Sequence, residues 1–239
     1  MASLNDQARV LIVNADDFGR TPGINAGVVK ARDEGILTSA GLMVRWPAAV
    51  EAAAYARRDR ALALGLHVDL GEWHHDSDRW VTVYEVVDPE DSAAVEAEVR
   101  AQLDAFRRLT GQDPTHVDSH QHVHRRVGPV RTVIARLGAE LGVTVREVRG
   151  DVRYCGEFYG QDDEHRPLPG GILIDNLIRL IRELRPGITE LSCHPAIGDD
   201  SDSPYAGERE LEVEVLCDPR VKAVIADEGI ELRSFADIA

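Results

Sequence analysis

Short apolar runs rich in β-branched residues alternate with longer amphipathic segments from one end of this chain to the other. The short runs have the length and composition of buried strands, and the longer segments have the spacing of helices with one apolar face. Strands that alternate with helices in this way are typical of a parallel sheet. The predicted strands are residues 10–14, 39–44, 63–68, 116–119, 144–148, 189–193 and 231–234.

Helix signals fill the intervals between these strands. Thr21-Pro22 opens a helix that ends near Gly35, and Ser92 opens a charged helix that ends at Gly111. Further helices are predicted over 47–58, 129–141, 171–184 and 208–228, the last with a break at Pro219. Seven strands with intervening helices predict an α/β fold, a distorted or incomplete (β/α) barrel similar to a TIM barrel. An open doubly wound sheet is the main alternative.

The length of the chain and its irregular stretches complete this prediction. With 239 residues, 44% of them hydrophobic, the chain can build one sizeable core, so we expect a single domain over 1–239. The stretches 71–89, 150–170 and 196–207 fit neither period and are predicted to be loops. Each follows the carboxyl end of a predicted strand, where barrels place their catalytic face, so we expect these loops to bind substrate.

Charge and composition exclude several kinds of partner. The formal net charge of -15 repels phosphate backbones and anionic lipids, so neither nucleic acid nor a membrane is expected. Lys30 and Lys222 are the only lysines and lie in helical stretches, so a Schiff-base mechanism is not expected. Cys155, Cys193 and Cys217 form no C-x-x-C pair, and no signal peptide or long apolar run is present, so we expect a cytoplasmic protein. A homodimer is compatible with the sequence, which does not determine the oligomeric state.

Titratable side chains follow the predicted strands where each strand ends. They are Asp16 and Asp17 after the first strand, His67 and Asp69 at the third, Asp118 and His120 at the fourth, Arg146 and Glu147 at the fifth, and His194 after the sixth. In parallel strands these groups converge on one face. Asp16 and Asp17 place like charges close together, which raises one pKa unless a cation lies nearby. A divalent metal would relieve that repulsion; helix capping by one of the two is the alternative, although Thr21 is already a good cap.

Histidines are concentrated in the segment THVDSHQHVHRR. They are His116, His120, His122 and His124. Imidazole with carboxylate ligands suits zinc, manganese, iron, cobalt or nickel, whereas magnesium is less expected from the histidines alone. The alternatives are a solvated histidine-rich loop for this segment and hydrogen-bonded core histidines for His67 and His194.

Four motifs occur in the order and spacing of a known family. NADDFG, GLHVDL, HVDSHQHVH and CHPA resemble the motifs of the YdjC-like carbohydrate deacetylases, and the resemblance runs from about residue 10 to residue 238. Members of that family are cytoplasmic enzymes with a barrel-like fold. They use a divalent metal to remove acetyl groups from N-acetylated sugars such as chito-oligosaccharides. The resemblance therefore implies one divalent ion, magnesium or zinc, and an N-acetylated sugar as the substrate.

The same resemblance implies roles for individual residues. These roles are general base for Asp16, metal ligand for Asp17, His67 and His120, and candidate acid for His194. His124 and Arg146 are further candidates, for substrate binding. The family's run is often three consecutive histidines, but here Gln121 separates His120 from His122. This departure removes no implied ligand and leaves the roles of His122 and His124 open.

Two other functions remain open on the sequence. A metal-dependent phosphoesterase on the same barrel would be favoured by two bridged metals and by an anion-binding pair such as Arg125-Arg126. A non-enzymatic sugar-binding protein would be favoured by a failure to bind any metal.

Overall fold

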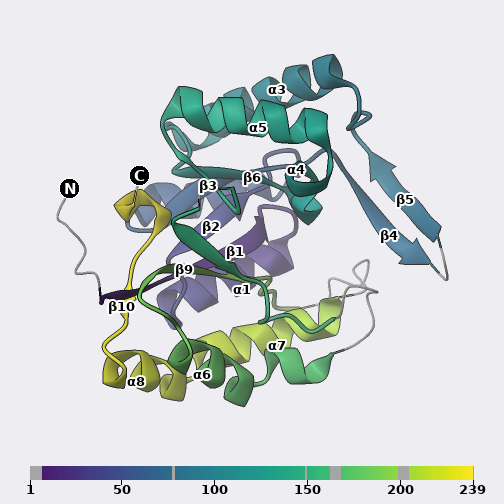
Figure 1. Cartoon of the computed structure of the whole chain (residues 1–239). Coiled ribbons are helices and arrows are strands. Elements are labelled where there is room, and N and C mark those ends of the chain that lie inside the picture. Colours follow the sequence, from purple (N-terminus) through teal and green to yellow (C-terminus); the bar gives the residue numbers. More distant parts are fainter. Residues whose placement is uncertain (1–6, 77–78, 149, 162–167, 199–204, 239) are drawn as a thin grey trace.

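The computed structural model describes residues 7–76, 79–148, 150–161, 168–198 and 205–238 (Figure 1). Its main sheet has the strand order β7-β6-β3-β2-β1-β9-β8, and β10 also pairs with β1. All of these pairings are parallel. The strands are β1 (Arg9–Phe18), β2 (Ser39–Leu42), β3 (Ala63–Val68), β6 (His116–Ser119), β7 (Thr144–Val145), β8 (Val152–Cys155), β9 (Gly187–Cys193) and β10 (Glu231–Leu232).

The route of the chain through this sheet distinguishes a barrel from a doubly wound sheet. From β1 the chain passes through the neighbouring strands β2, β3, β6 and β7, and it then returns through β8 and β9 to the other side of β1. A doubly wound sheet would instead run outward from its first strand in both directions. Within the described residues the ring is open only between β7 and β8. The predicted incomplete barrel is therefore confirmed, and the doubly wound alternative is wrong.

Helices cover the outside of the sheet, with α3 and α5 on one side and α6, α7 and α8 on the opposite side (Figure 1). The helices are α1 (Pro22–Asp33), α2 (Ala49–Arg58), α3 (Ser92–Thr110), α4 (Val123–Arg126), α5 (Gly128–Leu141), α6 (Ile174–Arg182), α7 (Ala206–Cys217) and α8 (Pro219–Asp227), with 3-10 turns η1 (His120–His122), η2 (Pro169–Ile172) and η3 (Phe235–Asp237). As the sequence predicts, the Thr21 side chain caps α1, and Gly111 ends α3 in a left-handed conformation. In the part of the chain that is described, no helix combines the length and apolar character needed to cross a membrane.

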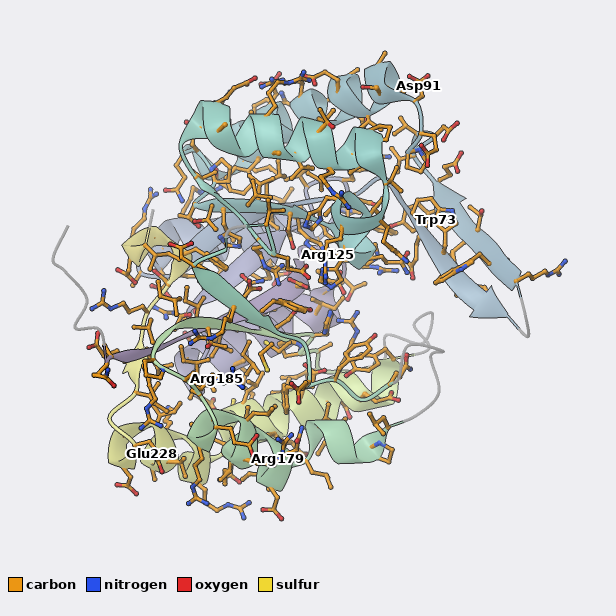
Figure 2. The ribbon with its side chains drawn as sticks, in the orientation of Figure 1. Trp73, Asp91, Arg125, Arg179, Arg185 and Glu228 are labelled. Carbon is orange, nitrogen blue, oxygen red and sulfur yellow. The ribbon has the colours of Figure 1, made fainter. Side chains whose placement is uncertain are left out.

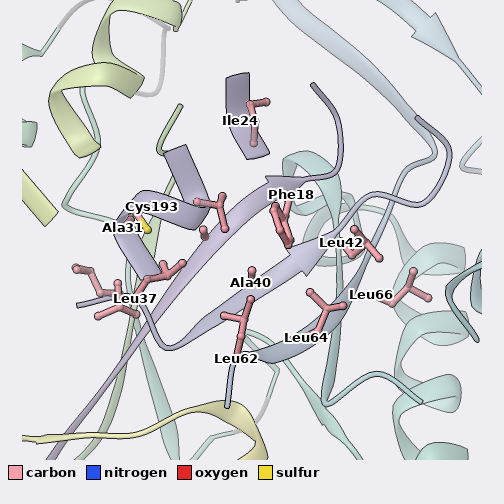
Figure 3. Packing of buried hydrophobic residues seen from close by; sticks show 14 of the residues in the cluster. Phe18, Ile24, Ala31, Leu37, Ala40, Leu42, Leu62, Leu64, Leu66 and Cys193 are labelled. Carbon is pink, nitrogen blue, oxygen red and sulfur yellow. The ribbon is translucent and has the colours of Figure 1, made fainter. Parts of the chain in front are cut away.

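Alternation along the strands separates apolar from polar side chains. On β3, Leu64 and Leu66 pack with Phe18 of β1 in the apolar core between sheet and helices (Figure 3). Successive side chains of a strand point to opposite faces, so His67 lies on the inside of the barrel. Gly41 on β2 leaves room for it, because a Cβ there would come within 3.1 Å of the His67 Cβ. The inside of the barrel at its carboxyl end is thus left to polar groups.

Two stretches predicted as loops contain strands. Stretch 71–89 forms an antiparallel hairpin of β4 (Gly71–Asp76) and β5 (Arg79–Glu85), which projects from the barrel (Figure 1). Stretch 150–170 contains β8. The charged and histidine residues of the hairpin conceal its alternation, and β8 is too short to show a period. In stretch 196–207, residues 199–204 lie outside the described part of the chain, and the rest holds no strand.

Strand ends also differ from the prediction in places. β3 and β6 have the predicted bounds, whereas β7 ends at Val145 rather than at residue 148. β1 continues past Asn14 to Phe18, so Asp16 and Asp17 lie inside the strand rather than after it. This extension brings both carboxylates to the edge of the barrel that the other predicted site residues share.

Candidate metal centre and active site

Asp17, His67 and His120 come together from β1, β3 and η1, and all three are buried. Asp17 Oδ1 lies 3.0 Å from His120 Nδ1 and 3.7 Å from His67 Nε2. One potential ligand atom of each residue lies within 4.8 Å of the others. Asp17 Oδ1, His67 Nε2 and His120 Nε2 are buried and make no hydrogen bond within the described residues. Such atoms are uncommon in folded proteins, and one carboxylate with two imidazoles is a donor set that fits a divalent ion.

Asp118 fixes the orientation of the His67 ring. Asp118 Oδ1 lies 2.8 Å from His67 Nδ1 and accepts its proton, so Nε2 is the nitrogen that faces Asp17 and would bind a metal. Burial acts to lower the pKa of His67, but Asp118 and Asp16 outweigh it and raise that pKa. A carboxylate behind a histidine is the usual support of a metal-binding imidazole.

Arg209 on α7 holds the other oxygen of Asp17. Its Nη2 donates to Asp17 Oδ2 at 2.6 Å, which leaves Oδ1 for the two histidines. Burial acts to raise the pKa of Asp17, but Arg209 and His120 outweigh it and hold that pKa well below its ordinary value. Sequence reasoning missed Arg209. Its one signal is that Arg209 and Glu212 fall on the same side of a predicted helix as Val213 and Leu216, a side that the fold buries.

Backbone strain is concentrated around these side chains. Asp17, Gln121, His122 and Glu147 have φ between 52° and 64°, a region that non-glycine residues seldom adopt. The β1–β2 register shifts at the same place, between Ala15 and Phe18. Strained conformations of this kind persist only where the surrounding structure fixes them, and they cluster at functional sites.

Asp16 lies next to this group but has different partners. Its Oδ1 accepts from Arg146 Nη1 at 2.6 Å and from Asn14 Nδ2 at 2.9 Å, and its Oδ2 accepts from the Ser192 hydroxyl at 3.2 Å. His194 Nε2 lies 3.8 Å from Oδ2. Burial acts to raise the pKa of Asp16, but Arg146 and His67 outweigh it and lower that pKa. Asp16 is therefore ionised at neutral pH.

Arg146 is surrounded by carboxylates and is only 1% exposed. Its guanidinium contacts Asp16, Asp118 and Glu190, with Nη2 at 2.5 Å from Glu190 Oε1. Asp16, His67 and Asp118 also have the spacing of a metal-ligand group. The buried guanidinium already supplies the positive charge at that point, so Asp17, His67 and His120 form the better candidate for a metal.

The two candidate substrate-binding residues lie inside the protein. All the charged nitrogens of Arg146 face carboxylates or the Ser192 hydroxyl. His124 is fully buried, with Nδ1 2.8 Å from the Ser119 hydroxyl and Nε2 3.2 Å from the Arg146 carbonyl. These contacts occupy both ring nitrogens of His124. The left-handed residues of η1 turn His120 toward Asp17 and His124 away from it.

His194 lies at the mouth of the site, clamped from α7. Its backbone N–H donates to Glu212 Oε2 at 2.5 Å, and its carbonyl accepts from Arg209 Nη1 at 3.2 Å. The rings of Tyr159 and Tyr205 lie 5.2 Å and 5.9 Å from its ring. Burial lowers the pKa of His194 to about 4, so the ring is uncharged at neutral pH.

Gln121 connects η1 to the hairpin. Its side-chain amide accepts from the Trp73 N–H at 3.0 Å and donates to the Trp73 carbonyl at 2.7 Å. Trp73 lies where the hairpin meets the barrel (Figure 2). Beside it, Glu72 Oε2 lies 3.7 Å from His120 Nε2 and 2.5 Å from Arg20 Nη2. The hairpin missed by the sequence analysis therefore contributes to the wall of the site.

This chain is similar to known proteins over nearly its whole length. The model of the YdjC-like protein family matches residues 10–227. The carbohydrate deacetylase of Geobacillus stearothermophilus is 33% identical over 251 aligned positions, which cover 96% of this chain and 98% of the relative. The chitooligosaccharide deacetylase of Salmonella paratyphi B is 31% identical over 267 positions, which cover 96% and 99%.

Two solved structures share the fold. A protein of Enterococcus faecalis V583, named as a candidate cellobiose-phosphate cleavage protein, superposes with a TM-score of 0.78 at 25% identity and covers 97% of this chain and 99% of its own. A family 4 carbohydrate esterase from Streptomyces lividans superposes with a TM-score of 0.57 at 14% identity, covering 96% and 92%. Since the family model and the sequence relatives span nearly the whole of it, this chain belongs to the YdjC-like family.

Proposed function

We propose that this protein is a metal-dependent carbohydrate deacetylase that hydrolyses the acetamide of an N-acetylated sugar and releases acetate. The observation that carries the proposal is the contrast between two adjacent carboxylates. Asp17 turns an unpaired oxygen toward His67 and His120, whereas Asp16 is held by Arg146 and Ser192. One is therefore suited to hold a divalent ion and the other to act as a base.

In this proposal Asp17, His67 and His120 hold the ion. A divalent ion held there would lower the pKa of a water molecule and polarise a carbonyl group, and zinc suits this donor set. Asp16 takes the proton of the attacking water, because its carboxylate is ionised at neutral pH. Arg146, bonded to Asp16 Oδ1, keeps that carboxylate in place.

His194 follows Asp16 in the proposed route of the proton. With its pKa at about 4, the His194 ring holds no proton to give to the leaving amine until it receives one. Asp16 Oδ2 lies 3.8 Å from His194 Nε2, and in this proposal it supplies that proton. Protonated Asp16 could also give its proton directly to the amine. Arg146 and His124, both enclosed by protein groups, support the site and do not bind substrate in this proposal.

The substrate class is supported by the relatives, which are named carbohydrate deacetylase and chitooligosaccharide deacetylase. The net charge of -15 also favours a neutral acetamido sugar over a strongly anionic substrate. We further propose a cytoplasmic location. All three cysteines are free of disulfide bonds, as expected in a reducing compartment.

The features that would favour a phosphoesterase are not supported by the geometry. Arg125 donates to the Glu147 carboxylate at 2.6 Å, and Arg126 donates to the Gln121 carbonyl at 2.7 Å, so each guanidinium group already has a partner within the protein. In the second group of metal-ligand spacing, Asp16 and Asp118 already pair with Arg146, which disfavours a second metal there.

The proposed reaction is tested by the masses of the products. Zinc-loaded protein is incubated with N-acetylglucosamine, with its β-1,4-linked oligomers and with a panel of sugar phosphates. We expect the loss of acetyl groups at unchanged chain length, with matching release of acetate. Shortened chains, or phosphate without acetate, would contradict the proposal.

A further inference from the structure

Glu212 on α7 is a fully buried carboxylate beside the candidate active site. Its Oε2 accepts the backbone N–H of His194 at 2.5 Å, and its Oε1 accepts the Tyr205 hydroxyl at 2.5 Å. The Tyr205 oxygen in turn accepts the Gly160 N–H at 2.7 Å. One carboxylate thus joins α7 to the segment that follows β9 and, through Tyr205, to the segment that follows β8.

Two stacked tyrosines also contact the His194 ring. The rings of Tyr159 and Tyr205 have centroids 4.5 Å apart and planes 17° from parallel. The His194 ring lies 5.2 Å from the Tyr159 ring and 5.9 Å from the Tyr205 ring. Gly171 packs so closely on the Tyr159 carbonyl that a Cβ at Gly171 would overlap it. Because Tyr205 is also bonded to Glu212, the backbone and the ring of His194 both depend on this one carboxylate.

The ring held in this way turns one nitrogen toward Asp16. His194 Nε2 lies 3.8 Å from Asp16 Oδ2, whereas His194 Nδ1 is buried and makes no hydrogen bond with any described residue. A proton passes between two groups only at hydrogen-bond distance, so a small displacement of this ring interrupts the transfer. Burial raises the pKa of Glu212 itself to about 7, so full ionisation is not needed for its two hydrogen bonds.

We propose that Glu212, through Tyr205 and the His194 backbone, is a positioning residue that holds His194 where it gives a proton to the leaving amine. An apolar side chain in its place would leave a buried N–H and a buried hydroxyl without their acceptor, so the residues around His194 would rearrange. This inference rests on the proposed function, and it selects proton donation by His194 over direct donation by Asp16.

A double-mutant cycle on kcat tests this inference, with zinc-loaded protein and β-1,4-linked N-acetylglucosamine oligomers. Glu212→Leu removes both acceptors at similar volume, and we expect kcat to fall about 10- to 100-fold at little-changed KM. Glu212→Gln keeps an acceptor for the His194 N–H and should retain most of kcat. In protein that already carries His194→Ala, Glu212→Leu should lower kcat by less than about twofold, because the group that it positions is absent.

Leu216→Ala is the matched control on α7. Leu216 is buried in the apolar core one turn beyond Glu212, so its truncation should lower the melting temperature and leave kcat unchanged. An equal fall in kcat for Glu212→Leu with and without His194, or an undiminished kcat in His194→Ala, overturns the inference while the proposed function stands. Release of no acetate by the wild type overturns the proposed function and the inference together.

Two further measurements apply even if Glu212→Leu fails to fold. Tyr205→Phe removes one hydrogen bond to Glu212 without loss of apolar volume, and we expect kcat to fall about three- to tenfold, with no further fall in His194→Ala. Exchange of the His194 amide, read by NMR, should be about tenfold faster in Tyr205→Phe than in the wild type. Unchanged kcat and unchanged amide exchange in Tyr205→Phe would overturn the inference.

Discussion

Two buried charge clusters lie side by side at the carboxyl end of this barrel, and they differ in how the charge of their carboxylates is compensated. Around Arg146, three carboxylates share a guanidinium that the chain itself supplies. Around Asp17, one oxygen is bonded by Arg209, while the other faces His120 Nδ1 at 3.0 Å and His67 Nε2 at 3.7 Å. Buried carboxylates need a compensating charge. The chain itself supplies the cation of the first cluster, whereas the second is arranged to take a metal cation from outside.

Replacing either of the two neighbouring carboxylates with an amide should have the largest effect, on kcat in one case and on metal binding in the other. In Asp16→Asn the base is lost, and we expect kcat to fall about 10²- to 10⁴-fold while metal and substrate binding persist. In Asp17→Asn we expect weaker metal binding itself. Steady-state kinetics with elemental analysis on the same samples measures both. Identical behaviour of the two variants would show that the two clusters do not differ in function.

Removal of the internal cation tests the Arg146 cluster alone. Arg146→Met leaves Asp16, Asp118 and Glu190 buried without their guanidinium, and we expect the free energy of unfolding to fall by about 3–5 kcal/mol. Arg107→Met is the matched control, since Arg107 and its partner Asp113 are 44% and 55% exposed, and should cost less than about 1 kcal/mol. Urea unfolding gives both values. A cost for Arg146→Met as small as that of Arg107→Met would contradict the account.

The pH dependence of the stability of the metal-free protein tests the charge state of His120 in the Asp17 cluster. Burial acts to lower the pKa of His120, but Asp17 outweighs it and raises that pKa to about 9. Because the pKa of His120 is higher in the folded than in the unfolded state, the protonated ring stabilises the fold. The contribution is therefore complete below about pH 6.5 and disappears as the pH rises through about 9.

We expect unfolding in the presence of a chelator to show lower stability at pH 9 than at pH 6.5. The His120→Ala variant should lack most of this difference. Bound metal should also remove it, since a ligand imidazole is unprotonated across the range. An unchanged pH dependence in His120→Ala would place the titrating group elsewhere.

The smallest expected effect concerns the connection between η1 and the hairpin. Gln121→Ala removes both hydrogen bonds to the Trp73 backbone, so amide exchange in β4 should become faster while global stability changes by about 1 kcal/mol. Hydrogen exchange read by mass spectrometry measures this, with Gln112→Ala as a control on an exposed contact. Unchanged exchange in β4 would show that other contacts hold the hairpin.

Strands with a strong local pattern could be predicted from the sequence, and so could the residues at their ends. β3 is a largely apolar run that contains His67 near its end, β6 directly precedes His120, and the bounds of both strands are those predicted. Parallel pairing then brings those ends together, which is why residues far apart in sequence could be placed in one site. The hairpin was missed because the polar and charged residues in and around it favoured a loop.

The supporting residues could not be predicted, because their environment depends on tertiary packing. Arg209 and Glu212 lie on a charged helix, and their position beside apolar residues indicates burial but not the site that they contact. Glu190 is a buried carboxylate in the middle of β9. Its burial is explained by the ion pair with Arg146, which follows β7. His124 illustrates the reverse case, since its histidine-rich surroundings indicated a site residue and the backbone turn of η1 directs it into the interior.

Zinc titration of metal-stripped protein, followed by calorimetry, tests directly whether Asp17, His67 and His120 bind the metal. The wild type and Asp16→Asn should each bind about one ion per chain, whereas Asp17→Asn, His67→Ala and His120→Ala should bind it far more weakly or not at all. Circular dichroism of each variant confirms that it remains folded. Full binding by folded His67→Ala and His120→Ala would contradict the assignment of the metal to the Asp17 cluster.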